Sequence, residues 1–186
     1  HLLPAADATL VGVAVGLALA GKTPVVELSG PEALWGALQQ IGQEASTLSG
    51  EFNTSIVLRV PMGPDCVDPT PMLTGIDNLQ VLSPAEPADA GVLVQSALQS
   101  PGVSVVLEPL SVLGSSGGTA GTDLRARLVQ EGDHLTLLAW GAGVSHAEAA
   151  AKTLGKEGVS VATGWSAWKQ VNAWNEEDWQ KDREKK

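Results

Sequence analysis

Few residues of this chain have the types and spacing that catalysis or metal binding would require. The three histidines, His1, His134 and His146, have no second potential ligand nearby in the sequence, so each is expected to be solvated. Cys66 is the only cysteine, which excludes an internal disulfide, and it would be reactive only where its surroundings lower its pKa. No GxGxxG follows a predicted strand, and neither HExxH nor CxxC occurs. We therefore predict no metal site within the chain.

Asp7 is the acidic residue that stands out. It precedes the apolar stretch "ATLVGVAVGLALAG", which predicts a helix that is buried on most sides and ends at Gly21. At the start of a helix a carboxylate can satisfy free backbone N–H groups and favour the helix dipole, and this structural role needs no chemistry. A chemical role would require a ligand nitrogen opposite Asp7.

The same predicted helix contains a GxxxG motif formed by Gly12 and Gly16. Two glycines at this spacing leave room for another backbone to approach closely. Tight packing within one subunit and a contact between subunits would both explain the motif, and we keep both interpretations.

The elements that must position these residues alternate between strand and helix. The predicted strands of the first part are 23–30, 54–61, 79–84 and 103–109. Pro31 begins one predicted helix, which Gly50 ends, and Pro87 lies in the first turn of another over 86–100. This alternation predicts an α/β fold with a mainly parallel sheet and helices on both faces.

The Gly- and Ser-rich stretch "VLGSSGGTAGTD" predicts a linker over 112–123, between a domain at 1–111 and a partial second lobe at 124–186. In that lobe we expect two strands around a turn at 131–133, a helix capped by Ser145, and a further strand over 159–164.

The C-terminal segment is rich in tryptophan, with Trp165, Trp168, Trp174 and Trp179. Indole rings commonly anchor an element against a partner surface. We expect an amphipathic closing helix that docks on its own chain, and the alternative is an anchor for another molecule.

The composition limits the classes of partner. A formal charge of −10 argues against binding the phosphate backbone of nucleic acids or an anionic membrane, since both need clustered Lys and Arg. The longest apolar run, 10–20, is about half of the roughly 20 residues that a membrane-spanning helix requires. With a single cysteine and no visible signal peptide, the cytoplasm is the expected compartment.

Three phrases of the sequence carry a family resemblance. They are "PAADATLVGVAVGLALAGKTPVVEL", "QQIGQEASTLSGEFNTSIVLRVPMG" and "NLQVLSPAEPADAGVLVQSALQSPGVSVVLEP". In this order they resemble the transketolase-like pyrimidine-binding domain of the beta subunits of 2-oxoacid (pyruvate or branched-chain) dehydrogenases. The stretch "HLTLLAWGAGVSHAEAAAKTLGKEGVSVATG" is similar to the start of the C-terminal domain of that family.

The resemblance implies thiamine diphosphate as cofactor, with Mg²⁺ and the diphosphate held by a partner domain on an alpha-type subunit. The glutamate that activates the cofactor in the family falls on Asp7, whose side chain is one methylene shorter. A displacement of about 1 Å can cost on the order of 100-fold in rate. The aromatic residues that pack around the pyrimidine correspond to the neighbourhood of Gly30 and Ala33, which offers no ring.

The connection after the strand at 54–61 also departs from the family, whose longer loop contains active-site histidines. Here the loop is short and acidic, and Asp65, Cys66 and Asp68 cannot replace an imidazole that titrates near neutrality. The chain therefore looks like a trimmed and degenerate beta subunit.

Three functions follow from this resemblance. The first is a structural or partner-binding protein with a degraded thiamine diphosphate site, acting as a homodimer or with an alpha-type subunit. The second is an active beta subunit of a thiamine diphosphate-dependent 2-oxoacid dehydrogenase that needs a separate alpha subunit. The third is a binding module for a small ligand in the former pyrimidine cleft.

Overall fold

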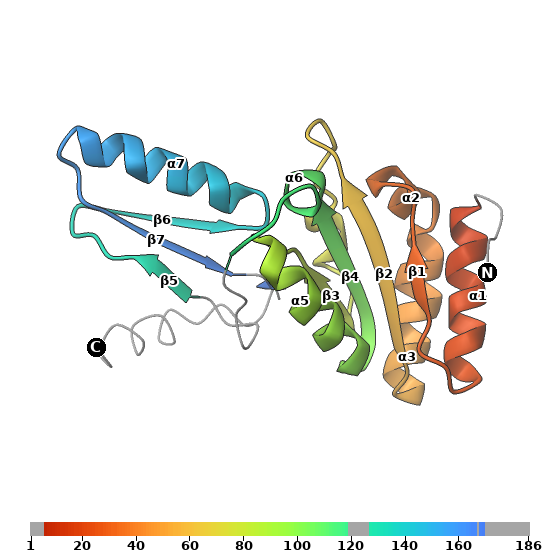
Figure 1. The fold of residues 1–186 in the computed structure, drawn as a ribbon. Helices are drawn as coiled ribbons and strands as arrows, with labels where there is room; N and C mark the ends of the chain where they lie inside the picture. The colour runs from red at the N-terminus through yellow and green to blue at the C-terminus, as the bar shows by residue number, and fades with distance from the viewer. Residues whose placement is uncertain (1–5, 119–126, 167, 170–186) are drawn as a thin grey trace.

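A computed structural model describes residues 6–118, 127–166 and 168–169 and divides them between two lobes, each built on one sheet (Figure 1). The strands are β1 (Val25–Glu27), β2 (Ser55–Met62), β3 (Leu79–Leu82), β4 (Gly102–Pro109), β5 (Arg127–Gln130), β6 (Leu135–Trp140), β7 (Val161–Ser166) and β8 (Trp168–Lys169). The helices are α1 (Asp7–Leu19), α2 (Pro31–Gly36), α3 (Ser46–Phe52), α4 (Thr70–Leu73), α5 (Pro87–Gln99), α6 (Leu110–Leu113) and α7 (Gly143–Lys156), with a π-helix, η1 (Gln40–Ala45), between α2 and α3.

The first lobe is an α/β layer structure, as the alternating pattern predicted. Its five-stranded sheet has the order β1-β2-β4-β3-β8, and β1, β2, β4 and β3 are parallel. Helices α1, α2 and η1 contribute to a core on one face of the sheet, and α5 contributes to a core on the other. All eight residues of β4 are buried, because both faces of this central strand are covered.

Helix α1 begins at Asp7 and ends at Leu19, and the left-handed Gly21 that follows, with φ of 77°, stops it as predicted. The N–H of Gly21 donates to Ala18 O, and the N–H of Lys22 donates to Leu17 O, which completes a Schellman motif. The expectation that this helix is buried on most sides is wrong. Only Val11, Ala14, Val15 and Ala18 are buried, because the sheet covers one face of the helix and no described element covers the other.

The helix predicted over 31–50 extends further and is interrupted. The π-helix η1 separates α2 from α3, and α3 continues through Gly50 to Phe52. The prediction that Gly50 ends the helix is therefore wrong. Asn53 ends it instead, because its backbone adopts the left-handed conformation with φ of 51°.

Helix α5 shows the expected start, with Pro87 at its first position. A capping box precedes it, in which the side chains of Glu86 and Asp89 each pair with the backbone of the other. The N–H of Glu86 donates to Asp89 Oδ2 over 3.1 Å.

The second lobe is a three-stranded sheet of order β5-β7-β6 with α7 packed against β6 and β7. The prediction that Ser145 caps the helix is wrong. Helix α7 starts earlier, at Gly143, and the Ser145 hydroxyl donates to Ala142 O from inside the first turn. A left-handed Gly141, with φ of 52°, turns the chain from β6 directly into this helix.

The segment after β7 returns to the first lobe, where β8 pairs antiparallel with β3. The prediction of a closing helix is wrong for Trp165 and Trp168, which lie in strands β7 and β8. Trp174 and Trp179 lie outside the described residues. The start of the predicted linker at 112–123 coincides with α6, and its residues from 119 onward lie outside the described part.

Candidate functional site

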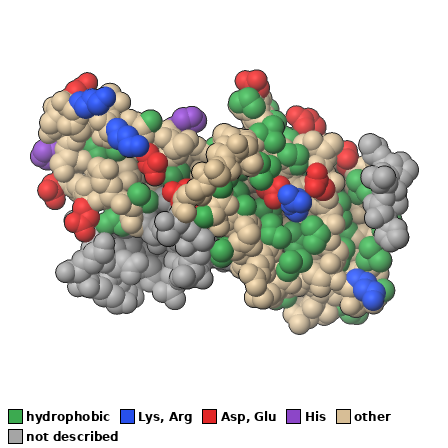
Figure 2. Space-filling model, viewed as in Figure 1, with side chains coloured by type: hydrophobic (Ala, Val, Ile, Leu, Met, Phe, Trp, Pro, Cys, Tyr) green, Lys and Arg blue, Asp and Glu red, His purple; other side chains and the backbone are tan. Residues whose placement is uncertain are grey.

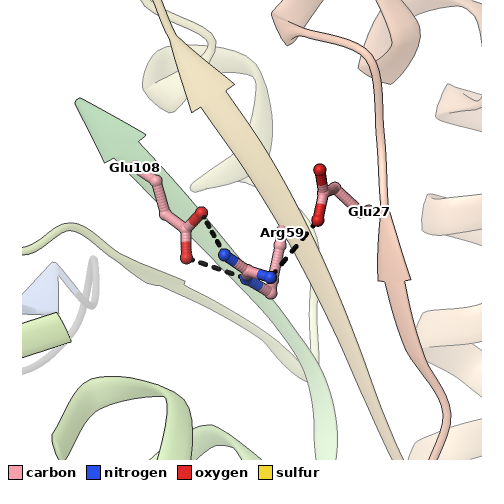
Figure 3. Close-up of polar contacts among 3 residues, drawn as sticks. All are labelled: Glu27, Arg59 and Glu108. Atoms are coloured by element: carbon pink, nitrogen blue, oxygen red, sulfur yellow. Dashed lines mark hydrogen bonds and ion pairs between the residues drawn. The ribbon is translucent and has the colours of Figure 1, made fainter. Parts of the chain in front are cut away.

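The carboxyl ends of the parallel strands hold an ionic cluster of Glu27, Arg59 and Glu108, shown in Figure 3. Arg59 Nε donates to Glu108 Oε1 over 2.9 Å, and Nη2 donates to Oε2 over 2.8 Å. Arg59 Nη1 lies 3.3 Å from Glu27 Oε2. The guanidinium thus bridges β1, β2 and β4, with a bidentate pair on one side and a single contact on the other.

The two glutamates of this cluster have different environments. The side chain of Glu108 is 4% exposed, whereas that of Glu27 is 70% exposed. A buried carboxylate without a partner is very costly, so the pairing with Arg59 matters most for Glu108. The hydrogen bonds to Glu108 raise the pKa of Arg59 above its usual value, so the guanidinium stays charged wherever the protein is folded.

Sequence reasoning missed this cluster, although a signal was present. Arg59 and Glu108 are charged residues inside two strands that are otherwise almost wholly apolar. Charges buried in neighbouring strands are expected to pair. Their separation of 49 residues hides the pairing until the order of the strands is known.

Asp7, the first predicted site residue, lies half-buried at the start of α1. Its carboxylate makes no side-chain cap to the helix, so the predicted capping role is wrong, although its position in the first turn still favours the dipole. A Cβ added at Gly36 would lie 3.5 Å from Asp7 Oδ2, so the carboxylate reaches the end of α2.

The other predicted cofactor contacts, Gly30 and Ala33, are less accessible than Asp7. Both are buried at the start of α2, and Ala33 is part of the hydrophobic core. Trp35, which is 52% exposed on the same helix, is the nearest aromatic residue in the sequence to these positions.

The loop after β2 is held by its own polar groups. The N–H of Gly63 donates to Cys66 Sγ over 3.2 Å, and the N–H of Thr70 donates to Asp68 Oδ1 over 2.9 Å. Cys66 is half-buried. Cys66 and Asp68 therefore both have structural partners within the loop.

Acidic residues gather at the same end of the first lobe. Glu27, Asp65, Asp68 and Glu86 all follow or end parallel strands, so they share the carboxyl edge of the sheet. Figure 2 shows red acidic side chains along the end of this lobe where α2 and the β2 loop lie in Figure 1. Residues 1–118 contain eleven Asp and Glu but only two Lys and Arg, a formal charge of −9. This edge would repel an anion such as diphosphate.

The GxxxG glycines of α1 face open space. A Cβ added at Gly12 or Gly16 would meet no atom within 4 Å. Beside them Val13, Leu17 and Leu19 are all more than 40% exposed. These five residues, which we call the α1 outer face, form an apolar surface.

The stretch from Gly16 to Thr23, "GLALAGKT", has the GxxxxGK[ST] spacing of a phosphate loop. Its position in the structure shows that it is not a phosphate loop. A phosphate loop follows a strand and opens a helix, whereas this stretch closes α1. A helix end presents carbonyl oxygens and negative partial charge, which do not bind phosphate.

The described residues contain neither a group suited to a metal ion nor a membrane-spanning helix. No three His, Cys, Asp or Glu side chains within residues 6–118, 127–166 and 168–169 are grouped as a metal site would need. No helix in the described part of the chain is long and apolar enough to cross a membrane.

Comparisons with known proteins agree on one group of relatives. Residues 124–163 match the family described as Transketolase, C-terminal domain. The chain is 29% identical over 175 residues to the pyruvate dehydrogenase E1 component subunit beta of Acholeplasma laidlawii. The matched region covers 85% of this chain and 54% of that protein. The identity to the same subunit of Staphylococcus epidermidis is 30%, and to the 2-oxoisovalerate dehydrogenase subunit beta of Bacillus subtilis 25%, with the same coverage.

Solved structures show the same fold. A split-gene transketolase, described as an inactive beta4 tetramer, has a TM-score of 0.77 at 22% identity and covers 88% of this chain and 55% of that chain. Transketolase from Leishmania mexicana has a TM-score of 0.74 at 19% identity, over 95% of this chain and 28% of that chain. The chain spans about half the length of the curated relatives it matches.

Proposed function

We propose a function for this chain from the premise that it is related to the beta subunits of 2-oxoacid dehydrogenases and shares the transketolase fold. The chain acts as a beta-subunit-like protein that keeps the packing and association surfaces of the fold, while its thiamine diphosphate site is degraded. Its role is to bind a partner, either a second copy or an alpha-type subunit.

The main support for this proposal is the burial of Gly30 and Ala33. The resemblance places the ring-packing residues of a thiamine diphosphate site at these positions, yet both positions lie in the packed start of α2 and neither has a ring. Asp7 alone of the three offers an accessible polar group. One carboxylate without an aromatic wall can accept a hydrogen bond but cannot hold a flat heterocycle in place.

The charge of the first lobe supports the same conclusion. A diphosphate group brought to the acidic carboxyl edge would face several carboxylates, while Arg59 is already paired with Glu108. The residues of this chain therefore do not fit the cofactor by themselves.

One observation favours the second candidate, an active beta subunit that works with an alpha-type subunit. Asp7 keeps a carboxylate at the start of α1 and remains half-exposed. A partner that supplied Mg²⁺ and the diphosphate contacts could use this carboxylate as an acceptor for a ring nitrogen.

Calorimetric titration of thiamine diphosphate with Mg²⁺ separates the two candidates. We expect no heat of binding with the chain alone and none after an alpha-type subunit from the same source is added. Binding that requires the subunit, and that is lost in Asp7→Asn but kept in Glu32→Gln, would establish the active subunit instead. Glu32 is the matched control because it is an exposed acid on the neighbouring helix α2.

The α1 outer face is the association surface that we assign to this role. Gly12 and Gly16 leave open space in which a partner helix can approach closely, and the neighbouring apolar side chains gain from being buried.

Leucine substitutions test this surface. Gly12→Leu and Gly16→Leu should be tolerated by the isolated chain, since a Cβ added at either position meets no atom of another element within 4 Å, but they would block a close helix contact. Gly91→Leu is the control, because Gly91 lies in α5 with equally open surroundings. In sedimentation velocity, alone and with an alpha-type subunit, we expect the α1 variants to lose association and the Gly91 variant to keep it. Equal association of all three variants would remove α1 from the interface.

A further inference from the structure

The outer edge of β3 is closed by an unusual strand. Strands β1 to β4 of the first sheet are parallel, but β8 runs antiparallel to β3, with Leu82 opposite Trp168 and Val81 opposite Lys169. Strand β8 has two residues, and a single residue separates it from β7 of the other sheet.

The register shows which backbone groups of β3 face this edge. The N–H of Val103 in β4 donates to Asn78 O, so the alternate residues Gln80 and Leu82 also direct their backbone groups toward β4. The N–H and C=O of Leu79 and Val81 therefore face outward. Val81 lies directly opposite Lys169 and can exchange two hydrogen bonds with it.

Among the described residues, β8 covers only part of this edge. β8 lies against Val81 and Leu82, which are buried, whereas Leu79 and Gln80 are half-buried and have no paired residue in β8. An unpaired strand edge is a template for another extended segment. Strand β3 thus has four residues, of which the described strand β8 pairs with two.

We propose that the outer edge of β3 is a strand-docking site, and that the chain fills this site with its own Trp168–Lys169 segment and so keeps it closed to strands from other molecules. The ligand class is an extended peptide that runs antiparallel to β3 and is bound through its backbone. This inference is independent of the thiamine diphosphate site and of the α1 outer face.

A labelled peptide tests the site directly. The probe is a fluorescein-labelled copy of residues 166–171, "SAWKQV", titrated into two forms of the chain, one ending at Ser166 and one ending at Lys169. If the intramolecular strand occupies the edge in about nine of ten molecules, it weakens the apparent affinity for a competitor about tenfold. We expect binding to the form that ends at Ser166 and at least about tenfold weaker binding to the form that keeps β8. Equal binding to both forms, or binding to neither, would overturn the proposal.

A second measurement on the full chain does not depend on how the shortened forms fold. Lys169→Pro removes the backbone N–H that faces Val81, whereas Lys169→Ala keeps it. Hydrogen exchange of the Val81 amide is expected to become at least about tenfold faster in the proline variant and to stay unchanged in the alanine variant. Unchanged exchange of Val81 in both variants would show that β8 does not close this edge.

Discussion

The two lobes cover their sheets differently. In the first lobe, helices pack on both faces, and Leu58 of β2 and Val105 of β4 have no exposed surface. In the second lobe, the described helix α7 covers one face, and Leu138 of β6 is 52% exposed. A sheet with one covered face buries less apolar area for each residue it orders, so it gains less stability.

The second lobe compensates by packing against the first. Val144 of α7 belongs to the core that α5 forms with the first sheet, and Ala139 of β6 packs against that core. Trp140 packs against the core on the opposite face. At Gly141 the two lobes come so close that an added Cβ would lie 2.5 Å from Ser83 Oγ. The second lobe therefore gains part of its burial from the first, whereas the core of the first lobe is largely its own.

The largest expected effect comes from replacing a leucine by alanine in each sheet and comparing the loss of stability. Leu58→Ala opens a cavity in a fully covered sheet and is expected to lower the free energy of unfolding by about 2–5 kcal/mol. Leu138→Ala removes the same atoms from an exposed position and should cost less than about 1 kcal/mol. Urea denaturation followed by circular dichroism measures both, and similar costs would show that the second sheet is covered as fully as the first.

The ionic cluster of the first lobe gives the next effect. Glu108→Gln leaves Arg59 without its buried carboxylate and is expected to destabilise the fold by about 2–3 kcal/mol, below the usual cost of breaking a buried pair because Arg59 is one-third exposed. Glu27→Gln changes an exposed partner and should cost less than about 1 kcal/mol.

A double replacement checks the origin of that cost. When Arg59→Met and Glu108→Leu are combined, no unpaired charge remains, so most of the loss should be recovered. A double variant as unstable as the sum of the single variants would show that packing, and not the lone charge, dominates.

The junction of the lobes gives a smaller effect. Gly141→Ala places a Cβ against Ser83 at a left-handed backbone, and about 1–2 kcal/mol of destabilisation is expected. Gly143→Ala, two residues later, meets only Ala139 Cβ at 3.9 Å and should be neutral or slightly stabilising. Amide hydrogen exchange in α7 should become faster in Gly141→Ala but not in Gly143→Ala. An unchanged exchange rate of α7 in Gly141→Ala would show that Gly141 does not hold the lobes together.

The smallest effect concerns the helix starts of the two lobes. Ser145→Ala removes a hydroxyl that bonds inside α7 without capping it, so the free energy of unfolding should change by less than about 0.5 kcal/mol. Asp89→Ala removes the capping box of α5 and should cost about 1 kcal/mol. Thermal unfolding compares the two variants, and a larger loss for Ser145→Ala would restore its predicted capping role.

The sequence by itself determined the local elements of this protein. Apolar runs in β2 and β4 specified buried parallel strands, Pro87 marked the start of α5, and Gly21 marked the end of α1. These features depend on backbone conformations and side-chain patterns within a few residues, so they can be read without knowledge of the rest of the chain.

Only the tertiary structure decided which side chains meet and which faces stay open. The pairing of Arg59 with Glu108, the burial of Ala33 and the exposure of the α1 outer face all depend on which elements pack together. The pairing of β8 with β3 joins residues more than 80 positions apart, and no local pattern encodes it. Periodicity shows that one side of an element is apolar, but the register and order of the strands decide what covers that side.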